Sequence, residues 1–460
     1  MKEHLGVLSN SKNDWINFET WDVDIPKIPE RSKLFNLEPI SFGNINVESL
    51  TSYIHRISRI HSLPFNTVFK QLIRMYFYEN ENTNIRRYSV NGIQSTALKF
   101  STAMNKLTLT DNKRQLTLLD FNGVFVSKEI ETKRKWCPVC FEELKLSGQP
   151  LYEKLVWSIK ILEECPIHKC KLQFQCPHCN ASLEHLNINA EIGYCSECNR
   201  WLGSLNKQDI QYKTNFHKWV HDSLETIFVL RDSNIRLLER EYIVDRIKIF
   251  LKSTLPNNNI NPKNFSEQIG TSTRTLNSIL EGHHSYSFRF LLCLTFSSGI
   301  PLDKFLDGNL NNWKIKELTK ADEEYYDRKT TLRKYSHDQL ANILKGIIEN
   351  DSISPKSLNE VSKDLGYSNP WSLRNYFPEE TKVISKRYKE YMQQLKDENY
   401  KQLFNDLENC ILQCDRNGEY PSQQRLGEML NREGLFLIPK VYSKRREIMD
   451  SLGIEIKRHY

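Results

Sequence analysis

The sequence predicts a mainly α-helical protein of several domains, and three observations lead to this prediction. The chain has 460 residues. Since a domain usually has about 100–200 residues, three or four domains are expected. Apolar residues recur at helical spacing over most of the chain. Eight of the eleven cysteines lie between Cys137 and Cys198, so a cysteine-rich segment separates two helical parts.

The bulk composition predicts a folded, water-soluble chain. Apolar residues make up 39% and charged residues 26%, which is enough apolar material to build packed cores. The net charge of +7 permits nucleic-acid binding without proving it. The most apolar stretch, residues 288–300, is too short to cross a bilayer, and no signal sequence is recognisable. We therefore expect a cytoplasmic protein with no membrane role.

Residues 1–135 are predicted to form an N-terminal helical domain. Its first helix has five apolar residues on one face: Val47, Leu50, Ile54, Ile57 and Ile60. A second helix is expected after Pro64, with four apolar residues along it: Val68, Phe69, Leu72 and Ile73. Residues 80–135 are interpreted as short strands and turns.

Residues 136–205 are predicted to form a double metal-binding module. Cysteines remain reduced in the cytosol, so a dense cluster there points to metal and not to disulfides. Zinc prefers four tetrahedral ligands, and each C-x-x-C turn supplies two of them. Two sets of four ligands are therefore expected to bind two Zn²⁺ ions: Cys137, Cys140, Cys165 and His168, then Cys176, Cys179, Cys195 and Cys198.

The fourth ligand of the first set has two candidates. His168 keeps the two-residue spacing after Cys165, but Cys170 lies only two residues further on and is the alternative. The gap before Cys165 is predicted to hold an amphipathic helix with four apolar residues on one face: Leu151, Leu155, Ile159 and Leu162. His178 is interpreted as a surface residue. The alternative to metal sites is a cluster of buried free cysteines.

Ions with four protein ligands have no open coordination position, so we expect them to hold the fold and not to activate water. No GxxxxGK[ST] phosphate loop is present. No spacing of acidic residues singles out a nuclease site. The sequence therefore predicts a protein that is not an enzyme, although a scattered acidic triad stays possible on sequence alone.

A helical domain over residues 215–310 is predicted to contain a helix-turn-helix of the phage-repressor type. Gly270 permits the turn, and Ser272 can cap the second helix. Leu276, Ile279 and Leu280 would face the core. Six residues would then face DNA: Ser272, Thr273, Arg274, Thr275, Asn277 and Ser278. The alternative is an ordinary two-helix corner.

Residues 330–415 are predicted to hold a second helix-turn-helix and a long helix over 384–412. Gly366 marks the turn, and four residues on or near the second helix are candidates for DNA contact: Asn369, Ser372, Arg374 and Asn375. Trp371 is interpreted as a core residue. The charged face of the long helix is expected to be solvated.

Residues 416–460 are predicted to form a third, basic module resembling a helix-turn-helix. A helix is expected to start at Pro421–Ser422, and Pro439 interrupts the chain. Four basic residues are candidates for phosphate contact: Lys440, Lys444, Arg445 and Arg446. Lys457 and Arg458 add to the charge of this end. A solvated charged face is the equal alternative.

Several modules in one chain favour a long DNA site, because each module reads few base pairs and linked modules multiply affinity. The segments DIPKIPERSKLF and VESLTSYIHRISRIHSLPFNTVF, with CPVC, CPIH, CPHC and CSEC in this order, resemble the TniQ/TnsD family over residues 22–205. By position, five residues match the N-terminal helix of that family: Glu48, Ser49, Leu50, Tyr53 and Arg56.

The resemblance implies a TniQ-type domain over residues 1–135 and a target-site selector for a Tn-seven-like transposon. Its implied partners are a double-stranded DNA attachment site, an AAA+ ATPase regulator contacted through residues 1–135, and the transposase. About 250 residues follow the zinc region, which favours a long, TnsD-like member that reads DNA directly. Two alternatives stay open: an adaptor on an RNA-guided CRISPR effector, and a plain transcription regulator.

Overall fold

A computed structural model describes most of the chain and is mainly helical. The described residues are 30–76, 90–131, 133–185, 191–205, 215–281, 286–308, 313–315, 317–320, 335–349, 354–367, 370–432 and 434–456. Within these ranges the β-structure consists of isolated bridges between single residue pairs, such as Glu48 with Lys154. The predicted α-helical fold class is confirmed.

The described residues of the N-terminal part form three helices and three short 3₁₀ turns. They are α1 (Leu50–Ile60), α2 (Phe65–Tyr76), α3 (Ser95–Thr108), η2 (Asn112–Leu116), η3 (Leu119–Phe121) and η4 (Ser127–Glu129). Both predicted helices are confirmed, although α1 begins at Leu50 and Ile60 is 46% exposed. The prediction of strands is wrong for α3. Its apolar residues Phe100, Ala103, Met104 and Leu107 follow helical spacing and are buried.

The segment between the two halves of the first cysteine set is mostly extended. Only α4 (Pro138–Leu146) and the 3₁₀ turn η5 (Leu155–Ser158) are helical here. The predicted amphipathic helix is therefore wrong. Residues 152–159 are all buried, so this segment has no solvent-facing side. Bridges from Lys154 to Glu48 and from Ile159 to Ile130 hold it in place instead.

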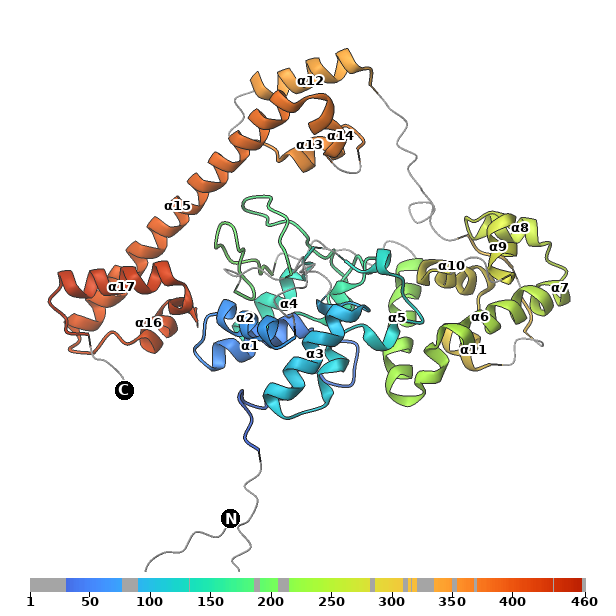
Figure 1. Cartoon of the computed structure of the whole chain (residues 1–460), viewed down its shortest axis with the longest axis horizontal. Helices are drawn as coiled ribbons and strands as arrows, with labels where there is room; N and C mark the ends of the chain where they lie inside the picture. The colour runs from blue at the N-terminus through green and yellow to red at the C-terminus, as the bar shows by residue number, and fades with distance from the viewer. Residues whose placement is uncertain are drawn as a thin grey trace, which may run out of the picture.

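Helices α5 to α11 follow the cysteine-rich segment. Their bounds are α5 (Asn215–Ser233), η6 (Ile235–Leu238), α6 (Arg240–Ile249), the π-helical turn η7 (Phe250–Thr254), α7 (Leu255–Asn257), α8 (Pro262–Gln268), α9 (Thr273–Leu280), α10 (Phe288–Ser298) and α11 (Leu302–Asp307). Figure 1 shows them together on one side of the N-terminal helices.

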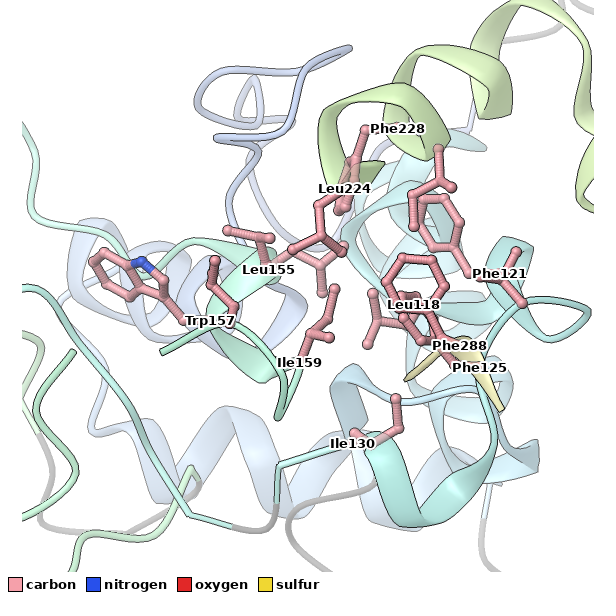
Figure 2. Packing of buried hydrophobic residues seen from close by; sticks show 14 of the residues in the cluster. Leu118, Phe121, Phe125, Ile130, Leu155, Trp157, Ile159, Leu224, Phe228 and Phe288 are labelled. Carbon is pink, nitrogen blue, oxygen red and sulfur yellow. The ribbon is translucent and has the colours of Figure 1, made fainter. Parts of the chain in front are cut away.

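One continuous hydrophobic core joins all α-helices from α1 to α11. It runs from Leu34 to Leu306 and includes the cysteines of both sets. In Figure 2, Phe121 of η3, Trp157 of η5 and Phe228 of α5 contribute to the same packing. The rings of Phe121 and Phe228 are 4.8 Å apart between centroids. The N-terminal helices, the cysteine-rich segment and α5–α11 therefore stabilise one another.

The C-terminal part is organised along one long helix. Its elements are α12 (His337–Glu349), α13 (Leu358–Asp364), α14 (Trp371–Tyr376), α15 (Pro378–Arg416), α16 (Gln423–Met429), the 3₁₀ turn η10 (Leu435–Leu437) and α17 (Pro439–Ser451). The predicted long helix is confirmed as α15, which has 39 residues. Figure 1 shows α12–α14 near one end of it and α16–α17 near the other.

Two small cores lie at the two ends of α15. The first packs Leu344, Val361 and Leu373 against Ile384 near the start of α15. The second packs Leu426 and other residues of α16–α17 against the C-terminal half of α15, namely Tyr400, Leu407, Ile411 and Cys414. The long helix therefore joins two separate small modules.

Candidate metal centres and nucleic-acid interface

The cysteine-rich turns are shaped by their own backbone. In the second set, Asn180 donates its backbone N–H to the Cys176 carbonyl at 2.8 Å, and Asn199 repeats this bond to Cys195 at 2.9 Å. Both asparagines have positive φ angles, 55° and 62°, which Asn tolerates better than most residues. Each turn folds back and points two thiols to one side, as a metal site requires.

The second set forms a compact cluster of four buried thiols. Cys176 Sγ lies 3.7 Å from Cys198 Sγ, and Cys179 Sγ lies 3.7 Å from Cys195 Sγ. A Zn–S bond of about 2.3 Å implies tetrahedral edges of about 3.8 Å, so these separations fit one ion. A disulfide would need about 2.05 Å, and all four cysteines are free.

The first set also gathers its predicted side chains. The donor atoms of Cys137, Cys140, Cys165 and His168 all lie within 4.8 Å of one another. His168 Nδ1 lies 3.4 Å from Cys137 Sγ, 3.3 Å from Cys140 Sγ and 3.6 Å from Cys165 Sγ. Both clusters are therefore compatible with a zinc ion.

The surroundings of His168 fit its role as the fourth ligand. Its Nε2 donates to Glu143 Oε2 at 2.7 Å, while its Nδ1 faces the three thiols. Metal-binding histidines commonly donate their second ring N–H to a carboxylate, which fixes the tautomer. Cys170 Sγ contacts Cys137 Sγ at 3.4 Å but lies outside the set of four donors. The geometry thus favours His168 over Cys170, and His178 is exposed and donates to the Trp201 carbonyl.

The five residues that match the TniQ/TnsD pattern hold α1 in place. Glu48 is fully buried and accepts bonds from Arg56, whose Nη2 lies 2.8 Å from its Oε2. Ser49 caps α1, Leu50 is buried in the core, and Tyr53 donates to the Leu37 carbonyl at 3.0 Å. Since these side chains contact the chain itself, they position α1 and are not offered to a partner.

A buried ion pair ties the N-terminal helices to the cysteine turns. Arg134 donates to the Glu153 carboxylate and, at 3.1 Å, to the Tyr194 carbonyl just before Cys195. The backbone N–H of Glu153 donates to Ser52 Oγ of α1 at 3.0 Å. Burial raises the pKa of Glu153, and Arg134 opposes this effect. The second cysteine set is therefore fixed relative to α1.

The first predicted helix-turn-helix comprises α8 and α9. Gly270 at the turn has φ +64°, and Ser272 Oγ accepts the Thr275 N–H at 3.1 Å as the cap of α9. Leu276 and Ile279 are buried. Ser272, Arg274 and Asn277 are exposed, whereas three residues are half-buried: Thr273, Thr275 and Ser278. Exposed Arg and Asn side chains on α9 can donate hydrogen bonds to base edges.

The second predicted helix-turn-helix comprises α13 and α14. Gly366 at the turn has φ +83°. Arg374 and Asn375 are exposed and Ser372 is half-buried, while Asn369 lies outside the described residues. The interpretation of Trp371 as a core residue is wrong, because its side chain is 67% exposed. Leu373 and Phe377 point inward instead, so the face with Trp371 is turned to solvent.

The third module exposes fewer basic groups than predicted. Arg446 is exposed, but Lys444 pairs with Glu447 at 2.6 Å and Lys440 lies 3.7 Å from Asp397. Arg445 is 4% exposed, and its Nη2 donates to the Pro421 carbonyl at 2.7 Å. The assignment of Arg445 to phosphate contact is therefore wrong: its guanidinium holds α17 on α16. Lys457 and Arg458 lie outside the described residues.

Together these features define a class: mainly helical proteins with two cysteine-rich clusters compatible with zinc and with appended helical modules. Within that class, residues 39–172 match the TniQ family model. The chain therefore carries a TniQ domain over these residues, and this domain implies a transposition-associated function. Members of this family are non-catalytic adaptors and DNA-binding proteins.

No curated protein matches the chain. Among the described residues, none of the helices combines the length and the apolar character needed to cross a bilayer. The family match ends at residue 172, after the first metal cluster and before the second. The second cluster and all later helices thus lie outside the matched region.

Proposed function

We propose that this protein binds one specific double-stranded DNA site and presents it to a transposition machine as a long, TnsD-like target selector. In this proposal the C-terminal helical modules bind the attachment site. The TniQ domain recruits an AAA+ ATPase regulator and, through it, the transposase. The protein performs no catalysis and acts in the cytoplasm, and two zinc ions hold its central turns in shape.

The observation that supports direct DNA reading is the surface of α9. The helix is capped by Ser272 and packs by Leu276 and Ile279, so its orientation is fixed. Its outward face carries Arg274 and Asn277, both exposed. Arg pairs with guanine and Asn with adenine in the major groove. A short adaptor would have no use for such a helix some 100 residues beyond its TniQ domain.

Footprinting on the DNA that flanks the transposon encoding this protein tests this function. We expect one protected tract in the absence of any guide RNA, with affinity that falls steeply as salt rises. Equal binding to every duplex would contradict the proposal. Recovery of CRISPR subunits with the protein would favour the adaptor role, and a complex with DNA but never with an AAA+ ATPase would favour a transcription regulator.

Replacement of Arg274 tests the role of α9 itself. Arg274→Ala should weaken binding to the protected site by about 1–3 kcal/mol if the guanidinium pairs with a guanine. Arg236→Ala removes an exposed arginine outside the proposed reading helix and serves as the matched control. Titrations by fluorescence anisotropy measure both. Equal affinities of the two variants would remove Arg274 from the interface.

A further inference from the structure

The second metal cluster is also a docking surface for the C-terminal part of the chain. Three consecutive residues at the end of its last turn make this contact: Cys198, Asn199 and Arg200. The side-chain amide of Asn399 on α15 donates to the Cys198 carbonyl at 2.8 Å and accepts from Arg200 Nε at 2.8 Å. The Asn399 amide therefore forms hydrogen bonds with the residues on both sides of Asn199.

Apolar contacts accompany this amide on the same face of α15. Met392 and Leu395 pack against the main core. Together with Asn399 they occupy positions i, i+3 and i+7, which form one stripe along a helix. The contact thus has an apolar part and a directional polar part, both near the middle of α15. The small core of α12–α14 lies before this stripe, and that of α16–α17 lies mostly after it.

Arg432 adds a second attachment from the loop after α16. Its Nε and Nη2 donate to Glu191 Oε2 at 2.9 and 2.8 Å, and its Nη2 also donates to Asn199 Oδ1. Its guanidinium carbon lies 3.9 Å from the centroid of the Tyr194 ring. Arg432 is 7% exposed, so these contacts are shielded from water.

The turn that receives Asn399 and Arg432 is the turn that bears two proposed metal ligands. Cys195 and Cys198 belong to the second cluster, and Asn199 owes its left-handed conformation to the fold of that turn. The carbonyl of Cys198 and the side chain of Asn199 point correctly only while the turn is closed. Metal binding at the second cluster would therefore favour attachment of the C-terminal part through these three adjacent residues.

We propose that Asn399 and Arg432 are positioning residues that lock α15 to the second metal cluster and so fix the spacing between the DNA tracts read by α9 and by the C-terminal modules. The docking is a property of the free protein, while its consequence for DNA spacing rests on the proposed function. Because α15 has 39 residues, it spans about 58 Å, or about 17 base pairs of B-DNA.

Scattering by the full-length protein tests the docking without DNA. Asn399→Ala combined with Arg432→Ala should increase the maximum dimension in small-angle X-ray scattering, with unchanged helix content by circular dichroism. Gln394→Ala removes an exposed amide from the same helix and should leave the scattering unchanged. Unchanged scattering in the double variant would overturn the proposal.

A charge exchange guards against simple misfolding of the variant. Arg432→Glu alone places two carboxylates together and should release the module. Combining it with Glu191→Arg restores an opposite-charge pair and should return the scattering to that of the parent protein. If the exchanged pair stays expanded while the helix content is normal, the Arg432–Glu191 contact does not position the module.

Binding to spaced DNA sites tests the consequence for spacing. Two, four or six base pairs are inserted between the tract protected by α9 and that protected by the C-terminal modules. The parent protein should lose about tenfold or more in affinity, because a rigid protein cannot engage both tracts. The double alanine variant should bind the uninserted site more weakly but lose less than about threefold across the series. Parallel losses in both proteins would overturn the positioning role.

The two measurements separate the two proposals. If the double variant expands in solution but no DNA tract is protected by the parent protein, the proposed function fails and the docking of α15 stands. If a tract is protected and the double variant neither expands nor relaxes the spacing requirement, the proposed function stands and the positioning role fails.

Discussion

The two cysteine-rich clusters are built from similar turns but differ in which parts of the chain contact them. The first cluster lies inside the TniQ match and is enclosed by the main core: Phe141 packs on Trp157, and His221 of α5 hydrogen-bonds the Glu164 carbonyl next to Cys165. The second cluster lies after the match and receives Asn399 and Arg432 from more than 190 residues away. The turns of both clusters thus contribute to the main core, and those of the second cluster also join the C-terminal part of the chain to it.

Loss of a ligand from the first cluster should have the largest effect. Structural zinc contributes about 10–16 kcal/mol of binding free energy, and zinc bound here would stabilise the main core by such an amount. Cys140→Ser should lower the free energy of unfolding of the main core by more than about 5 kcal/mol, which is enough to unfold an ordinary domain. Thermal unfolding and zinc content measure this effect. Cys170→Ser is the matched control and should keep both ions; loss of an ion in this control would make Cys170 the ligand in place of His168.

Loss of a ligand from the second cluster should have a smaller and more local effect. Cys195→Ser should open the turn and free the C-terminal modules, while near-ultraviolet circular dichroism of the buried tryptophans in the main core persists. Hydrogen exchange should rise in residues 191–205 and 417–432 and stay low in α5. Exchange that rises everywhere, or nowhere, would erase the distinction between the two clusters.

Glu143, the hydrogen-bond partner of His168, allows a test in which metal binding at the first cluster is weakened but not abolished. Glu143→Ala removes the carboxylate that accepts the Nε2–H of His168. Such a loss typically weakens metal affinity about 10–100-fold, or about 1.4–2.7 kcal/mol. Competition with a chelator should reveal one weakened ion and one unchanged ion. Equal weakening of both ions would mean that the clusters are not independent.

The smallest expected effect distinguishes neighbouring arginines on α17. Arg445→Ala should destabilise the C-terminal module by about 1–2 kcal/mol, because it leaves the buried Pro421 carbonyl without its donor. Arg446→Ala should change stability by less than about 0.5 kcal/mol, since its side chain is exposed. Urea unfolding measures both. If the two variants behave alike, the burial of Arg445 has no energetic weight.

The metal clusters could be predicted from sequence because their chemistry is local. Each turn needs two ligands at a fixed short spacing, and the structure gathers all eight predicted side chains. The α1 and α2 helices were predictable for a similar reason, since their apolar residues repeat at helical spacing, and α15 was expected from a long stretch rich in Lys and Glu. Ser272 and Gly270 also act as their local chemistry predicts.

The errors arose where tertiary contacts decide the outcome. Residues 152–159 have helix-compatible apolar spacing, yet they are buried on every side and pair with Glu48 and Ile130 instead. Trp371 is exposed because Leu373 and Phe377 already fill the small core. Arg445 is buried because its guanidinium donates hydrogen bonds to the Pro421 carbonyl, which lies 24 residues away in the sequence. Asn399 and Arg432 gave no local signal, since their partners lie in a different part of the chain.

The attachment of α15 near its middle makes this helix a lever. From Asn399 to its first residue, Pro378, the arm has 21 rises and is about 32 Å long. A tilt of about 10° at the pivot would shift that end by about 5–6 Å, which exceeds the 3.4 Å rise of one base pair. A small displacement at the Asn399 amide would thus shift the far end of α15 by more than one base pair. Substitutions at Asn399 should therefore impair recognition of the DNA sequence, although this residue lies far from any base.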